Sequence, residues 1–378
     1  MINQERLCTE FARQAAIASP SRREGEISRY LQARFRELGG EVVMDGAATP
    51  AGSESGNLIV RFPARNKTAE PFMLSVHMDT VEPAEGVRPV LKEGVFSSAG
   101  ETILGADDKA GIAEIIEALE VVRERDIAHG PLEVVITICE EIGLVGAKLL
   151  DYSLIRSRRG LALDTNGVDR IIHRAPCANK LRFEIQGREA HAGIAPEKGL
   201  SAIAVAGRAI AGMRLGRIDE ETTANLGTIH GGQATNIVPN RVVIEGEVRS
   251  HNEEKLVRQT EHMVNCFLES ARQTALELDG QREQASVQVE VIGDYPLMRV
   301  PEEAGIIQLV LQAGAALNRP IAVAAAGGGS DANIFNSHGI ETVILGTGMD
   351  RVHSIDEQVT VADMVRVSEL LVEIIRQA

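Results

Sequence analysis

The sequence predicts an α/β protein with a mostly parallel sheet, helices on both faces of that sheet, and an inserted α+β domain. Short apolar strands alternate with amphipathic helices in the first part of the chain, which is the pattern of a parallel sheet with crossover helices. The pattern changes over residues 179–292, where strands alternate apolar and polar residues and would each have one wet face. From residue 293 the first pattern returns.

The composition is typical of a globular chain with more than one domain. Its 378 residues are 44% hydrophobic and 25% charged. A chain of this length is too long to fold around a single ordinary hydrophobic core. The net charge of -15 argues against a nucleic-acid partner. We expect no membrane partner, because no apolar run reaches about 18 residues. The N-terminal segment is charged where a secretory signal would be apolar, so we expect a cytoplasmic protein.

The first domain is predicted over residues 1–178 and 293–378. It begins with helices over 5–17 and 21–38, and Ser21 and Glu24 have the spacing of a capping box at the start of the second helix. The remaining predicted elements are strands at 41–44, 57–62, 72–77, 132–139, 160–163 and 341–345, and helices at 109–122, 143–150, 306–317 and 361–376.

The inserted domain, residues 179–292, is predicted to have the order β-α-β-β-α-β, which is typical of a ferredoxin-like unit. Apolar and polar residues alternate in its strands, and its two helices are longer than those strands. The predicted strands are 181–186, 224–229, 242–249 and 286–291, and the helices are 199–214 and 252–278.

Acidic and imidazole side chains follow several strands of the first domain. His77 and Asp79 are two residues apart at a strand end, so their side chains point to the same side. The carboxyl ends of strands line the ligand crevice of open α/β sheets, so these groups should converge. Such a cluster is costly to desolvate without cations, and we predict two divalent metal ions: zinc, or alternatively cobalt or manganese. The other members are Asp107, Glu140, Glu141, Asp164 and His353.

Segments that span almost the whole chain resemble the dinuclear-zinc peptidase superfamily of peptidase T, glutamate carboxypeptidase and aminoacylase. In order they are HMDTV, GADDKAG, CEEIG, LDTNG, GREAHAG, TNIVPN and VHS. GADDKAG and the AHAG segment are most similar to the peptidase T branch. The resemblance implies that His77 and Asp164 hold one metal, that Glu141 and His353 hold the other, and that Asp107 bridges them.

The same resemblance implies that Asp79 orients His77, that Glu140 is the general base toward the water between the ions, and that a cis peptide follows Asp107. The residues alone leave alternatives. Asp107 or Asp108 could cap the helix that follows. Glu140 and Glu141 could be a solvated pair. Adjacent residues of a regular strand point to opposite faces, so the chain must turn here if both glutamates are to face the metal site.

Three candidate substrate residues lie in the inserted domain. The resemblance implies that His191 donates to the carbonyl oxygen of the substrate from a partner's lid, in a homodimer joined through the inserted domain. Asn236 and Arg249 look like lid residues that hold polar groups or the carboxylate of the substrate, although Arg249 could be a surface charge. A monomer whose lid closes on its own site is the alternative to the dimer. GGGSDAN (327–333) lacks the ending of a phosphate loop and is interpreted as a turn that lines the cleft.

Three functions compete at this point. The first is a peptidase that acts on short peptides, of the tripeptide aminopeptidase type. The second is a related deacylase that acts on N-acyl amino acids, and the third is a non-catalytic binding protein on the same fold. The presence of every ligand position and of Glu140 speaks against the third.

Overall fold

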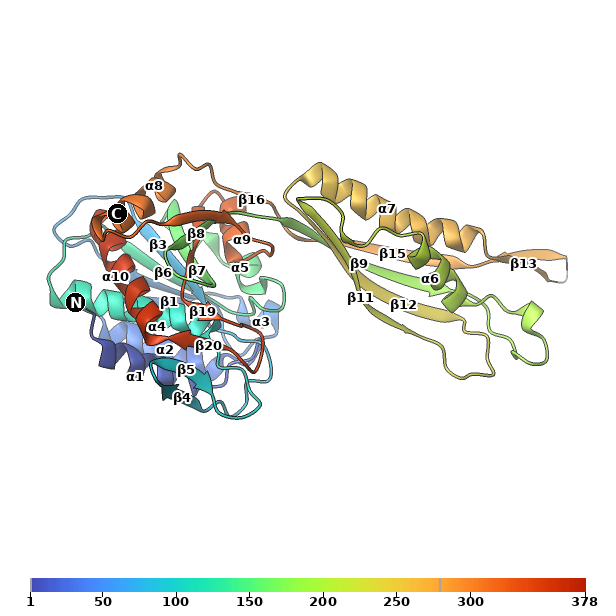
Figure 1. Cartoon of the computed structure of the whole chain (residues 1–378), viewed down its shortest axis with the longest axis horizontal. Helices are drawn as coiled ribbons and strands as arrows, with labels where there is room; N and C mark the ends of the chain where they lie inside the picture. Colours follow the sequence, from blue (N-terminus) through green and yellow to red (C-terminus); the bar gives the residue numbers. More distant parts are fainter. Residues whose placement is uncertain (1, 279) are drawn as a thin grey trace. The chain divides into compact units, whose positions relative to one another are not determined.

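The chain folds into two compact units (Figure 1). The computed structural model describes residues 2–278 and 280–378. Unit 1 comprises Met1–Ala175 and Met298–Ala378, and unit 2 comprises Pro176–Leu297. Unit 2 is slightly wider than the predicted 179–292, because strands β9 (Cys177–Gln186) and β15 (Ser286–Tyr295) run almost to its ends.

The central sheet of unit 1 has a parallel middle and antiparallel flanks. The middle consists of β6 (Leu132–Thr137), β3 (Phe72–His77), β7 (Arg159–Thr165) and β18 (Glu341–Gly346) in spatial order. The flanks are β1 (Glu41–Met44) and β2 (Leu58–Phe62) beside β6, and β8 (Arg170–Ala175) and β16 (Met298–Arg299) beside β18, with β17 (Ala322–Ala325) parallel to β8. The predicted parallel sheet is confirmed for the middle, where β3 and β6 are buried at every position.

Helices cover both faces of this sheet. Leu161 and Leu163 of β7 pack into one core and Ala162 into another, as expected for successive residues of a strand. The first core includes α2 (Gly25–Glu37), α4 (Ala106–Glu124), α8 (Gly305–Ala316) and α10 (Val361–Gln377), and the second includes Ala332 of α9 (Asp331–Ser337). The remaining helical segments of unit 1 are α1 (Gln4–Ala15), α3 (Ala48–Ala51), α5 (Val145–Leu149) and the 3-10 turn Tyr152–Leu154. In the described ranges, no helix is long and apolar enough to cross a membrane.

The predicted capping box at Ser21 and Glu24 is wrong. Helix α2 begins at Gly25, and Glu24 makes no side-chain capping bond. The Ser21 hydroxyl instead donates to Asp79 Oδ2 at 2.6 Å, and the Glu24 carboxylate accepts from the backbone N–H of Cys139 at 3.1 Å. Both side chains are therefore used in tertiary contacts with strand ends, which the local pattern does not contain.

A small second sheet in unit 1 was not predicted. Its order is β19 (Met349–Asp350), β20 (Gln358–Thr360), β5 (Val95–Ser98) and β4 (Pro89–Lys92). The loop between β19 and β20 carries His353, so this sheet fixes both ends of a loop that the sequence predicts to hold a metal ligand.

Unit 2 has the predicted ferredoxin-like order. Its antiparallel sheet runs β10 (Gly216–Arg217), β11 (Thr222–Gly231), β12 (Arg241–Ser250), β9 and β15, and one face is covered by α6 (Ala202–Ala211) and α7 (Glu253–Arg272). A short 3-10 turn spans Pro196–Lys198. Helix α7 ends before the predicted residue 278, because the chain there enters the hairpin of β13 (Ala275–Leu278) and β14 (Gln281–Gln284), visible beyond the sheet in Figure 1.

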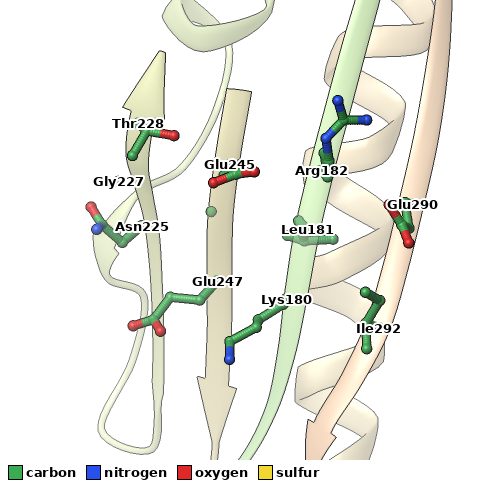
Figure 2. Close-up of a pocket in the computed structure, with 11 residues that line it drawn as sticks. Lys180, Leu181, Arg182, Asn225, Gly227, Thr228, Glu245, Glu247, Glu290 and Ile292 are labelled. Carbon is green, nitrogen blue, oxygen red and sulfur yellow. The ribbon is translucent and has the colours of Figure 1, made fainter. Parts of the chain in front are cut away.

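The other face of the unit 2 sheet is open and charged. A hollow of about 510 Å³ lies on this face, lined by residues of β11, β12, β9 and β15. Figure 2 shows these residues as sticks. Lys180 and Arg182 lie on β9 between Glu245 and Glu247 of β12 and Glu290 of β15. The face is therefore polar where the helix-covered face is apolar, which is the alternation that the sequence predicts.

Candidate metal centre

Parallel strands place the predicted ligands at one edge of the unit 1 sheet. His77 is the last residue of β3, Asp164 lies near the end of β7, and Glu140 and Glu141 follow the end of β6. Because β6, β3 and β7 are parallel neighbours, their carboxyl ends meet at the same edge.

Asp107 lies between two histidines. Its Oδ1 is 3.0 Å from His77 Nε2, and its Oδ2 is 3.3 Å from His353 Nε2. His77 Nε2 is also 3.9 Å from Asp164 Oδ1, and His353 Nε2 is 3.0 Å from Glu141 Oε2. The structure thus brings the five predicted ligands together, with one carboxylate shared and one further carboxylate beside each imidazole.

The two adjacent aspartates of GADDKAG have different surroundings. The peptide bond between Asp107 and Asp108 is cis, as the resemblance implies. Asp108 is fully buried, and its Oδ2 accepts from the backbone N–H of His77 at 3.3 Å. The helical φ/ψ values of α4 are interrupted at Asp107 and Asp108, and Asp108 Oδ1 has no hydrogen-bond partner among the described residues, so no capping bond from these aspartates to the following turn is recorded there.

Asp79 connects the end of β3 to the turn after β6. Its carboxylate accepts from the backbone N–H of Glu140 at 2.9 Å and of Glu141 at 3.2 Å. His77 Nδ1 is closer to the backbone oxygen of Asp79, at 2.9 Å, than to its carboxylate Oδ1, at 3.6 Å. Asp79 therefore contacts His77 mainly through its main chain and uses its carboxylate to hold the two glutamates.

The chain turns at Glu140 and Glu141, and the two side chains separate. Cys139 has a φ of +52°, and the backbone N–H of Leu144 donates to Glu140 O at 2.7 Å. Glu141 Oε2 faces His353. Over the described residues, no contact within 4 Å joins the Glu140 carboxylate to His77 or His353. Both glutamates are largely buried, so the alternative of a solvated pair is wrong.

Burial and like charges dominate the electrostatics of this cluster. Burial, and then the neighbouring carboxylates, raise the pKa of Glu140 and of Asp164. Hydrogen bonds to Asp107 and Glu141 raise the pKa of His353 to about 10. Burial opposes ionisation of Asp107, but hydrogen bonds from His353 and His77 outweigh it and lower the pKa of this carboxyl.

These residues fit a divalent cation. One ligand atom each of His77, Asp107 and Glu141 lie within 4.8 Å of one another. Glu141 Oε1 is buried, and among the described residues no group donates a hydrogen bond to it. A buried carboxylate oxygen without a donor, in a group of carboxylates and imidazoles, is a donor set for zinc or a related metal.

Two buried acids near this cluster were missed. Asp331, within the GGGSDAN segment, accepts from Thr137 Oγ1 at 2.5 Å, and burial raises its pKa to about 6. Its negative charge also contributes to the raised pKa of Glu140. Glu357, four residues after His353, is also buried. The available signals were an acid two residues after a glycine run, for Asp331, and an acid in the same segment as a predicted ligand, for Glu357.

Unit 2 brings two of its three candidate residues together. Asn236 O accepts from the backbone N–H of Ala192, next to His191, at 2.9 Å, and the side chains of His191 and Asn236 belong to exposed residues. Arg249 lies eight residues beyond Arg241 along β12, or about 27 Å. Its Nη2 is 2.9 Å from Glu247 Oε2. His191 and Asn236 therefore lie at one end of this sheet and Arg249 at the other.

Carboxylates and imidazoles at the strand ends of unit 1 form the donor set of a hydrolytic metal centre, and comparison with known proteins gives the same class, a metallopeptidase. The chain belongs to Peptidase family M20/M25/M40, whose sequence model matches residues 73–377. The predicted relationship to peptidase T and its superfamily is confirmed.

Three similar proteins cover the whole chain. The uncharacterized protein YqjE of Bacillus subtilis (strain 168) is 42% identical over 379 residues, which is 100% of both chains. The crystal structure of aminopeptidase PepT from Bacillus cereus ATCC 10987 is 42% identical, covers 100% of this chain and 99% of its own, and has a TM-score of 0.89. A tripeptidase structure from Staphylococcus aureus subsp. aureus mu50 is 36% identical, with coverages of 100% and 98% and a TM-score of 0.93.

Proposed function

We propose that this metallopeptidase cleaves amide bonds of short peptides and is of the tripeptide aminopeptidase type. The observation that carries the proposal is the separation of Glu140 from Glu141, which leaves one glutamate beside the histidine cluster and the other available for proton transfer. The similarity at 36–42% identity to structures described as an aminopeptidase and a tripeptidase supports the substrate class.

Two divalent metal ions, zinc or alternatively cobalt or manganese, would be held by the cluster. His77 and Asp164 would hold one, Glu141 and His353 the other, and Asp107 would contact both, since its two oxygens face different histidines. When bound, such ions lower the pKa of a coordinated water and polarise the scissile carbonyl.

Glu140 is assigned as the general base. Its carboxylate accepts a proton from the attacking water and then delivers it to the nitrogen of the leaving amine. Asp79 holds the backbone N–H groups of Glu140 and Glu141, so it keeps both side chains in place through the turn. His191 donates to the carbonyl oxygen as negative charge develops there, while Asn236 and Arg249 contact polar groups or the carboxylate of the substrate.

The proposed active form is a homodimer joined through unit 2. Strand β9 begins at Cys177, one residue inside unit 2, and His191 follows its far end, after about 30 Å of strand. Arg249, in contrast, pairs with Ala178 at the near end. In this proposal the His191 of one copy serves the metal cluster of the other copy. A monomer whose unit 2 closes on its own site is the competing arrangement.

A substrate panel tests the proposed function. Purified protein loaded with zinc, cobalt or manganese is assayed on di- and tripeptides with a free N-terminus and on N-acyl amino acids. We expect metal-dependent release of the N-terminal residue, with tripeptides preferred. Faster cleavage of N-acyl amino acids would identify a deacylase, and no hydrolysis with two metals bound would favour a binding protein. The cytoplasmic location stays a prediction.

A further inference from the structure

Glu357 is a buried carboxylate that the proposed chemistry does not use. It is 2% exposed and lies in the loop between β19 and β20, which also carries His353. Its Oε2 accepts from the backbone N–H groups of Leu104 at 2.8 Å and Gly105 at 2.7 Å. Its Oε1 accepts from the backbone N–H of Asp107 at 3.0 Å.

These three amides belong to the turn that leads into Asp107. Gly105 has a φ of +76° and is the residue before α4, and the amides at a helix start have no acceptor within the helix itself. Buried amides without an acceptor cost about 1–3 kcal/mol each. The Glu357 carboxylate supplies acceptors for this turn from a segment about 250 residues further along the chain.

A single side chain therefore ties two metal-ligand segments to each other. The backbone N–H of Glu357 donates to Ser354 O at 3.2 Å, so the residue ends a tight turn that begins directly after His353. His353 Nε2 lies 3.3 Å from Asp107 Oδ2, and Glu357 connects the two segments that carry these side chains. The buried Lys109 lies against Gly105 in the same turn, and its Nζ donates to Ile17 O at 2.7 Å.

We infer that Glu357 is a positioning residue that fixes Asp107 relative to His353 and thereby sets the affinity of the cluster for divalent ions. The inference rests on the part of the proposed function that assigns metal ions to this cluster. A role in stability alone would leave metal affinity unchanged in a folded variant, and the two roles can be separated experimentally.

The experiment compares Glu357→Gln with Asp356→Asn in the full-length chain. Asp356 is the adjacent acid in the same loop and is exposed, so this control removes the same charge without removing the three bonds. A glutamine can accept at one oxygen only, and its amide nitrogen would face a backbone donor. Zinc affinity is measured by competition with a chromophoric chelator, at a temperature where circular dichroism shows the metal-free chains folded.

We expect Glu357→Gln to bind at least one zinc ion about 10- to 100-fold more weakly than the wild type, because groups that orient metal ligands have effects of this size. Asp356→Asn should stay within a factor of about 2. Zinc affinities in Glu357→Gln equal to those of the control would overturn the inference, whatever the melting temperature of the variant.

A second variant covers the case in which Glu357→Gln does not fold. Glu357→Asp keeps the charge but is one methylene shorter, so it cannot reach all three amides, and its zinc affinity should fall by about tenfold. Wild-type affinity in that variant would overturn the inference. Because the readout is zinc binding, a chain that binds zinc but cleaves no peptide would contradict the proposed peptidase activity and leave this inference standing.

Discussion

Units 1 and 2 place the same kinds of charged side chains in opposite surroundings. In unit 1 the carboxylates of Asp107 and Asp164 lie beside His77, Glu140 is buried, and burial opposes the ionisation of all three. In unit 2 the carboxylate of Glu184 pairs with Arg182 and Arg241 on an open sheet face. Buried charges interact strongly and need a partner, whereas exposed pairs contribute little. The charges of unit 1 are thus buried and clustered, whereas Glu184 and its two arginines form pairs on an open face.

The largest expected effect is that of Glu140→Ala in unit 1. Loss of the proton acceptor should reduce hydrolysis of the best peptide by about 10²- to 10⁴-fold. The variant should keep both metal ions, because Glu140 is not among the predicted ligands. Steady-state kinetics and elemental analysis of the same sample check this expectation, and near wild-type turnover would refute the assignment of the base.

The neighbouring substitution Glu141→Ala is the matched control for that prediction. It removes a carboxylate that lies 3.0 Å from His353, so one metal ion should be lost. Two tightly held ions in this variant would show that the adjacent glutamates do not divide the roles of ligand and base.

The next prediction tests whether the two units cooperate across copies. His191→Ala should lower activity by about 10²- to 10³-fold, as for the loss of one donor to a developing oxyanion. When His191→Ala and Glu140→Ala chains are mixed and exchange subunits, activity should return, since one site of each mixed dimer has both residues. Subunit exchange is verified with differently tagged chains. No recovery after proven exchange would favour a monomeric site.

A smaller effect is expected in the pH dependence of the metal-free chain. The pKa of His353 is raised to about 10, so the stabilisation from its protonated form is present below the unfolded value of 6.5 and is lost as pH rises toward 10. The buried acids with raised pKa act in the same direction. The melting temperature of the metal-free wild type should fall as the pH rises from 6.5 toward 10, and that of His353→Gln should fall less steeply. An equal fall in that variant would contradict the prediction.

The smallest effect is expected for Glu184→Gln on the open face of unit 2. Arg241 and Arg182 lower the pKa of Glu184 to about 2, but the carboxylate is solvated and its pairs are screened. The melting temperature at neutral pH should not change beyond experimental error, and neither should peptide hydrolysis. A marked loss of stability would mean that the contrast between the two units is weaker than the structure indicates.

Local patterns in the sequence were sufficient for much of the fold. The apolar run of β3 ends at His77 as predicted, and the ferredoxin-like order of unit 2 follows from its alternating strands. Both depend on periodicity within a single element, which a sequence displays directly. Local reasoning failed at ends of elements, where α2 starts at Gly25 and α7 gives way to a hairpin, because neighbours distant in sequence decide where a helix stops.

The sequence by itself determined which residue types follow each strand, and therefore the donor set of a hydrolytic metal centre. Only the tertiary structure decided how these donors are held. Asp79 accepts from amides 61 and 62 residues away, and Glu357 from amides about 250 residues away. The physical reason is that a buried carboxylate is stabilised by whichever donors the fold brings to it. No periodicity along the chain encodes those partners.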